Sequence, residues 1–150
     1  MSAKPFKFSL ESVLKLRHHE TEKARAALAA ASGDRRAAEE RLAQIHAEQA
    51  KLTTSPFRSG VSAGVRRFVQ REAEHQRLAK AIHMAEAQVE TARHAEQRAR
   101  DHVRAQHQLE EALIRLRDQE AEAHQVEVLA AEAQFVDEQA ITRYYRTQQL

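Results

Sequence analysis

Residues 78–103 read LAKAIHMAEAQVETARHAEQRARDHV, and no glycine or proline interrupts them. Small and apolar residues recur here at alternating intervals of four and three, with one polar member: Leu78, Ile82, Ala85, Val89, Ala92, Glu96, Ala99 and Val103. A stripe with this spacing stays on one face of an α-helix, and it predicts packing against another helix as in a coiled coil.

The N-terminal third of the chain carries a second stripe with the same spacing. It comprises Leu10, Leu14, Arg17, Thr21, Ala24, Leu28, Ala31, Arg35, Ala38, Leu42, Ile45, Gln49 and Leu52. Alanine buries little apolar area, so the sequence predicts weak pairing per heptad. Ser9 is a suitable N-cap for this helix because its hydroxyl can accept a hydrogen bond from a free backbone N–H.

A turn-rich stretch with Pro56, Gly60 and Gly64 separates the two stripes, and Pro and Gly each break helices. We therefore expect a first helix over about 9–53, a connection over about 54–64 and a second helix over about 65–147. The predicted fold is all-α. It is an elongated two-helix antiparallel coiled coil that forms a single domain over 1–150.

Beyond Val103 the apolar pattern of the second helix is less regular. The stripe is expected to slip near Gln106 to Leu109 and to resume as Leu109, Leu113 and Leu116. A last apolar run comprises Val126, Leu129, Ala133, Val136, Ala140 and Tyr144. The second helix is much longer than the first. Either about half of it therefore overhangs, or the chain doubles back near residues 65–80, and the sequence leaves both arrangements open.

Composition excludes several classes of function. The formal net charge is only +2, from 24 basic and 22 acidic residues, and no block of like charge predicts binding to nucleic acid or to a membrane surface. No N-terminal apolar region resembles a secretory signal, and no run of about 20 apolar residues could span a bilayer. The expected location is cytoplasmic, with no direct membrane insertion.

The chain also lacks the side-chain constellations of an enzyme. Cysteine is absent, and no phosphate-binding loop or nucleophile motif occurs. Among nine histidines, His18 with Glu22 has the i,i+4 spacing of a helical metal site, and the others are scattered. We therefore expect no catalytic residues, no metal and no cofactor, and the histidines are expected to lie on solvated faces.

Aromatic residues cluster near the two ends of the chain. Phe6 and Phe8 are close to one end, and Tyr144 and Tyr145 are close to the other. An antiparallel hairpin would bring both ends to the same tip. The aromatic side chains would then either dock a partner or staple the termini together, and the sequence favours neither.

Four stretches, in order, resemble the FliJ family, the small coiled-coil component of the flagellar type III export apparatus. The opening has Phe6, Phe8, Leu10, Val13, Leu14, Leu16 and Arg17. Three internal stretches are AEERL at 38–42, LAKAI at 78–82 and VDEQA at 136–140. The last is similar to the D-E-x-A ending of the family, and the likeness extends over nearly the whole chain.

The resemblance implies a fold like the central stalk of a rotary ATPase and a role without catalysis. It implies that the tip enters the ring of the export ATPase hexamer through Phe6, Phe8, Leu10, Val13, Leu14, Val136, Asp137, Glu138 and Ala140. It implies contact with the cytoplasmic domain of the membrane export gate through Arg41, Ile45, Leu52, Leu78, Ala81 and Ala85. It also implies a link to export chaperones and a peripheral position at the inner-membrane face of the export apparatus.

Three alternative functions remain open at this point. The chain could be the equivalent stalk of an injectisome-type secretion system, a structural homo-oligomeric coiled coil or a stalk subunit of a rotary ATPase. The sequence does not separate a flagellar from an injectisome role, and it fixes neither stoichiometry nor affinity.

Overall fold

The chain forms two long α-helices. The structure, a computed structural model, describes residues 5–54 and 61–148, and side chains are described up to residue 54 and from 64 to 146. Helix α1 spans Glu11–Thr54 and helix α2 spans Val61–Gln148, and the described residues contain no strand. The prediction of an all-α helical hairpin is confirmed.

Helix α1 begins one turn after the N-terminal aromatic residues. The backbone carbonyl of Leu10 accepts the first helical hydrogen bond, from the N–H of Leu14 at 2.9 Å, and Ser9 and Leu10 form a turn. Glu11 lies in the first turn, where the helix dipole favours a negative charge. Phe8 is buried just ahead of this turn and anchors the entry of the chain.

Helix α2 begins at Val61, four residues before the expected start. Gly64 is therefore helical, as is Gly33 within α1. A helical glycine costs only about 1 kcal/mol relative to alanine, which an 88-residue helix tolerates. Pro56 and Gly60 lie outside the described residues.

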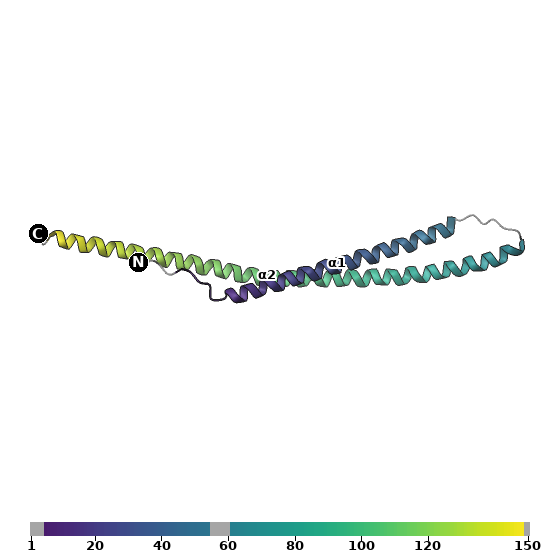
Figure 1. The fold of residues 1–150 in the computed structure, drawn as a ribbon, viewed down its shortest axis with the longest axis horizontal. Helices are drawn as coiled ribbons and strands as arrows, with labels where there is room; N and C mark the ends of the chain where they lie inside the picture. Colours follow the sequence, from purple (N-terminus) through teal and green to yellow (C-terminus); the bar gives the residue numbers. More distant parts are fainter. Residues whose placement is uncertain (1–4, 55–60, 149–150) are drawn as a thin grey trace. The chain divides into compact units, whose positions relative to one another are not determined.

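The described residues form two compact units, each built from parts of both helices. One unit combines residues 22–54 of α1 with residues 61–104 of α2. In this unit Arg35 meets Glu96, Glu39 meets Arg93, and the carbonyl of Leu52 meets Arg71. Partner numbers on α2 fall as residue numbers on α1 rise, so the helices run antiparallel (Figure 1).

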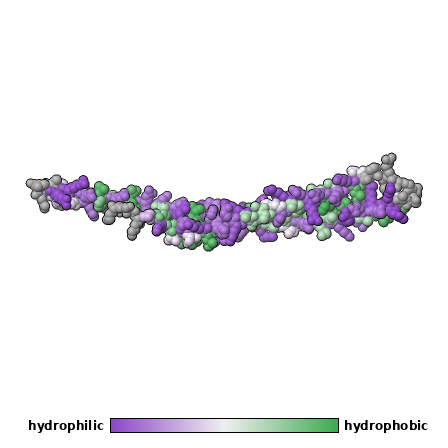
Figure 2. Space-filling model, in the orientation of Figure 1, coloured by the Kyte–Doolittle hydropathy of each residue, from purple (hydrophilic) through white to green (hydrophobic). Residues whose placement is uncertain are grey.

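The predicted stripe of α1 is the face that packs against α2. From Leu14 to Leu52 every member of the stripe is buried or half-buried, and Leu10 at its start is 36% exposed. On α2 all eight members from Leu78 to Val103 are likewise buried or half-buried. The core is thin, and polar residues dominate the face drawn in Figure 2, with hydrophobic residues in small groups between them.

The predicted slip on α2 near Gln106 to Leu109 is wrong. The alternation of four and three continues beyond Val103 through buried or half-buried residues: Gln106, Glu110, Leu113, Arg117, Glu120 and His124. Leu109 and Leu116, which were expected in the stripe, are 46% and 37% exposed. The apolar pattern misled because polar residues occupy most of the packed face in this part of α2.

The C-terminal part of α2 is uncovered. Every residue from Leu129 to Arg146 is exposed, including the members of the last apolar run that lie in this range. Of the two arrangements left open by the sequence, the structure shows an overhang, but the uncovered stretch begins at residue 129 and is much shorter than the expected half of the 88-residue helix.

The two sets of aromatic residues do not meet. Phe6 lies against His124, with ring centroids 5.8 Å apart, and this contact is twenty residues before Tyr144 on α2. Tyr144 and Tyr145 contact each other at 6.0 Å, and both are exposed. The expectation that the N-terminal and C-terminal aromatic residues share one tip is therefore wrong.

Candidate interaction surfaces

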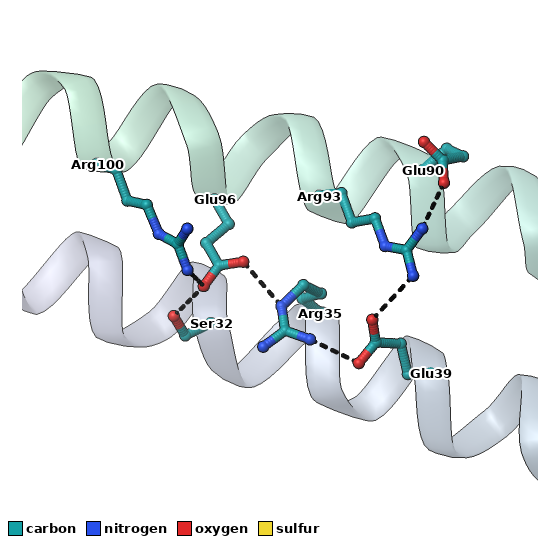
Figure 3. Close-up of polar contacts among 7 residues, drawn as sticks. All are labelled: Ser32, Arg35, Glu39, Glu90, Arg93, Glu96 and Arg100. Carbon is teal, nitrogen blue, oxygen red and sulfur yellow. Dashed lines mark hydrogen bonds and ion pairs between the residues drawn. The ribbon is translucent and has the colours of Figure 1, made fainter.

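A ladder of alternating charges joins the two helices in the unit formed by residues 22–104 (Figure 3). Arg100 contacts Glu96 at 2.9 Å, and Glu96 contacts Arg35 of α1 at 2.7 Å. Arg35 contacts Glu39 at 2.6 Å, and Glu39 contacts Arg93 of α2 at 3.3 Å. The ladder crosses between the helices twice, so it ties their register together.

Glu96 is the most enclosed member of this ladder. Its side chain is 7% exposed, and the Ser32 hydroxyl donates a hydrogen bond to it at 2.6 Å. This hydroxyl, followed by Arg100 and Arg35, lowers the pKa of the Glu96 carboxyl below its ordinary value, although desolvation acts in the opposite direction. The hydrogen bond from Arg35, with a smaller contribution from Arg93, lowers the pKa of Glu39 in the same way.

Sequence reasoning missed this ladder. Arg35 and Glu96 were recognised as polar members of the two stripes, but no pairing between them was predicted. The signal that could have found the pairing is one basic and one acidic residue, each at a packing position of its own helix. A polar residue at such a position is retained where another polar residue faces it.

The six residues expected to face the export gate are divided between the core and the surface of this unit. Leu78 and Ala85 are buried at 3% and 4% exposure, so they hold the helix pair together and cannot also contact a partner. Ile45, Leu52 and Ala81 are half-buried, and Arg41 is exposed. The surface left for a partner therefore centres on Arg41.

A groove and an ion pair mark the other unit, which combines residues 5–21 with residues 105–148. The Nδ1 atom of His18 lies 2.7 Å from a carboxylate oxygen of Glu110, whose side chain is 11% exposed. The groove beside this pair, of about 300 Å³, is lined by Leu14, Lys15, His18, Glu110, Ile114 and Arg117. Thr21, fully buried, donates its hydroxyl hydrogen bond to the Arg17 carbonyl at 3.0 Å.

The residues expected at the ATPase ring also lie in this unit but do not form one patch. Phe8 and Leu14 are buried, Phe6 is half-buried against His124, and Leu10 and Val13 are 36% and 38% exposed. The second half of the set is exposed on the uncovered part of α2: Val136, Asp137, Glu138 and Ala140.

Neither a metal site nor a membrane span is evident in the described parts of the chain. His18 pairs with Glu110, and Glu22 pairs with Arg25, so the i,i+4 pair of the sequence is not assembled. Within residues 5–54 and 61–148, no group of three His, Asp or Glu side chains could hold a metal ion. None of the described helical stretches is apolar over a length sufficient to cross a bilayer.

Comparison of the sequence with known families assigns the chain to one of them. The sequence matches the family described as flagellar FliJ protein over residues 6–149, which is nearly the whole chain. The chain belongs to the FliJ family. Membership implies a role related to flagellar protein export at the flagellar export apparatus. No curated protein and no solved structure matches the FliJ-family chain.

Proposed function

We propose that this FliJ-family chain is a non-catalytic stalk subunit of the flagellar type III export apparatus. It enters the ring of the export ATPase hexamer and links the ring to the cytoplasmic domain of the membrane export gate. The observation that carries the proposal is the family match over residues 6–149, and the antiparallel helix pair is the fold that a stalk requires.

The uncovered part of α2 supports the ring contact. Residues 129–146 expose apolar side chains such as Val136, 62% exposed, beside charges of both signs such as Asp137 and Arg143. A stalk must touch successive subunits of a ring without locking onto one, and mixed charges with scattered apolar groups give many weak contacts. Phe6 and Phe8 serve instead to fasten the N-terminal segment to the helix pair.

The gate contact is proposed for a surface that includes the exposed Arg41 and the half-buried Ile45, Leu52 and Ala81. Leu78 and Ala85 belong to the buried core of the same unit. The subunit would act on the cytoplasmic side, peripherally at the inner-membrane face of the export apparatus, and export chaperones would bind it in turn.

Hydrolysis by the export ATPase tests the ring contact. The chain should bind the ATPase and stimulate hydrolysis, and Val136→Asp should reduce the stimulation at least about fivefold. Gln134→Asp is the matched control, because it adds the same charge to an exposed position two residues away on another face of α2. Removal of residues 1–14 is a coarser test, since it also removes the buried Phe8 and Leu14.

A wild-type chain that neither binds nor stimulates the export ATPase would overturn the stalk function. The gate contact is tested separately, by pull-down of the gate's cytoplasmic domain with Arg41→Glu. Arg36→Glu is the matched control, because it makes the same change at an exposed position on another face of α1. Equal capture by both variants would remove Arg41 from the gate surface.

A further inference from the structure

Helix α2 carries a second heptad stripe in addition to the one that packs against α1. Its members alternate at intervals of four and three: Ala105, Leu109, Ala112, Leu116, Gln119, Ala123, Val126, Ala130, Ala133, Asp137, Ala140 and Tyr144. All twelve are exposed, and Val126 and Tyr144 are exposed by 67% and 60%. Only Gln119 and Asp137 are polar, so the composition is that of a coiled-coil seam, although the stripe lies on an exposed face of α2.

The second stripe is distinct from the packed face of α2. Up to Ala123 each of its members immediately precedes a buried or half-buried residue, as Leu109 precedes Glu110 and Leu116 precedes Arg117. One helical residue corresponds to a rotation of about 100°, so the stripe lies on the adjacent face. It also explains the apparent slip in the sequence, because Leu109 and Leu116 belong to this stripe and not to the seam.

The sequence of the stripe is complementary to itself when it is reversed. If Gln119 faces Asp137 of an antiparallel copy, the only two polar members meet, and the Gln amide can donate a hydrogen bond to the carboxylate. The same register places Leu116 opposite Ala140 and Tyr144 opposite Ala112, so large residues meet small ones. Val126 then faces Ala130, and Ala123 faces Ala133. A polar pair at one layer of an otherwise apolar seam specifies register in coiled coils.

We infer that the second stripe joins two copies of this chain into an antiparallel dimer. The paired stretch, from Ala112 to Tyr144, is roughly 50 Å long at the helical rise. With a helix width of about 12 Å it covers roughly 600 Å² on each copy, or about 1,200 Å² in total, the lower bound for specific interfaces. An interface of this size is compatible with a dimer that forms and dissociates reversibly.

Residues with like charges face each other beside the proposed seam, so electrostatic attraction is not what would hold the dimer together. Arg115 of one copy lies towards Arg143 of the second copy in this register, and Arg115 already has an acidic neighbour within its own chain, Glu111 at 3.3 Å. Salt screens like-charge repulsion between exposed groups. Raising the salt concentration should therefore leave the dimer unchanged or strengthen it.

Sedimentation equilibrium of the full chain tests the dimer. The mass should rise from 17.1 kDa towards about 34 kDa as the concentration approaches about 100 µM. Leu116→Glu and Ala140→Lys should each weaken association about tenfold or more. Both changes in one chain should restore it, because each Glu then faces a Lys of the second copy. Because these side chains are exposed, the helical circular dichroism of every variant should remain that of the wild type.

Cysteine crosslinking tests the register, since the natural chain contains no cysteine. The double variant Gln119→Cys with Asp137→Cys should form a covalent dimer on mild oxidation, and each single variant should not. The two positions are roughly 27 Å apart along one helix, too far for a bond within a chain.

A monomeric mass at every concentration would overturn the inference, as would crosslinking of either single variant, which requires a parallel or shifted pair. Association that persists unchanged in Leu116→Glu would assign the dimer to another surface. None of these experiments includes the export ATPase. A negative result for the dimer would therefore leave the proposed stalk function untouched, and the reverse also holds.

Discussion

Individual polar residues at packing positions hold the two helices in register. Leucine and alanine stripes pack almost equally well after a shift of one heptad, because their members are alike. Glu96, enclosed by Ser32 and Arg35 of α1, favours one alignment, since a shift would remove both of these partners and leave its buried carboxylate with Arg100 of its own helix. Glu110 is a second carboxylate at a packing position, in the other unit, and its partner across the helix pair is the exposed His18.

Glu96 should make the stability of the helix pair depend on pH. Its folded pKa is lower than that of an unfolded glutamate near 4.5, so its contribution is fully present above that value. The contribution is lost as the pH falls through the folded pKa. We expect a constant melting temperature from pH 7 to about 5.5 and a decline in more acidic buffer. Glu39 and Glu74 shift the same way and add to the decline.

Thermal melts of Glu96→Gln followed by circular dichroism check this expectation. The variant should melt below the wild type at pH 7, and the difference should shrink towards pH 3, where the wild-type carboxyl is protonated as well. Glu132→Gln is the matched control, because Glu132 is exposed on the uncovered part of α2. If the melting temperatures of the variant and the wild type differed by the same amount at all pH values, the negative charge of Glu96 would not be what stabilises the helix pair.

At the scale of the helices, the sequence predicted the parts in which apolar residues occupy the packed face. The α1 stripe from Leu14 to Leu52 and the α2 stripe from Leu78 to Val103 are both confirmed. The prediction failed where the packed face holds Gln106, Glu110 and Arg117, because hydropathy cannot identify a seam made of polar residues. The two parallel stripes of α2 then appear as one stripe with a slip.

A pair of leucine substitutions separates an unbroken seam from a slipped one. Leu113 is half-buried in the seam and Leu109 is 46% exposed, four residues earlier. Leu113→Gln should lower the free energy of unfolding by about 1–2 kcal/mol, because it removes apolar area from the seam. Leu109→Gln should change it by less than about 0.5 kcal/mol.

Urea denaturation of dilute, monomeric chains measures both effects. The substitution is the same at both positions, so differences in helix propensity cancel. Equal destabilisation by the two variants would mean that Leu109 is packed and that the seam slips after all.

At the scale of the whole molecule, the family could be predicted from sequence, but the functional surface could not. The four stretches that resemble FliJ carried the family, and the match over residues 6–149 bears it out. They did not separate residues that pack from residues that remain accessible, because the same stretches supply both. Leu78 and Leu14 are buried, while Arg41 and Val136 are exposed. Which residues of these stretches are buried depends on how the two helices pair.

The two proposals meet on one face of α2, and their combination makes a redox-dependent prediction. Asp137 and Ala140 belong both to the proposed ring contact and to the second stripe, so a dimer covers what the ring would bind. The oxidised Gln119→Cys, Asp137→Cys dimer should therefore fail to stimulate the export ATPase, and reduction of the disulfide should raise the stimulation to the level of the same variant before oxidation. The cysteine-free wild type is the control, because the same oxidant cannot crosslink it. If the covalent dimer stimulates hydrolysis as well as its reduced form does, the ring must contact another face of the chain. If the reduced form also fails while the wild type succeeds, Gln119 or Asp137 is itself needed at the ring.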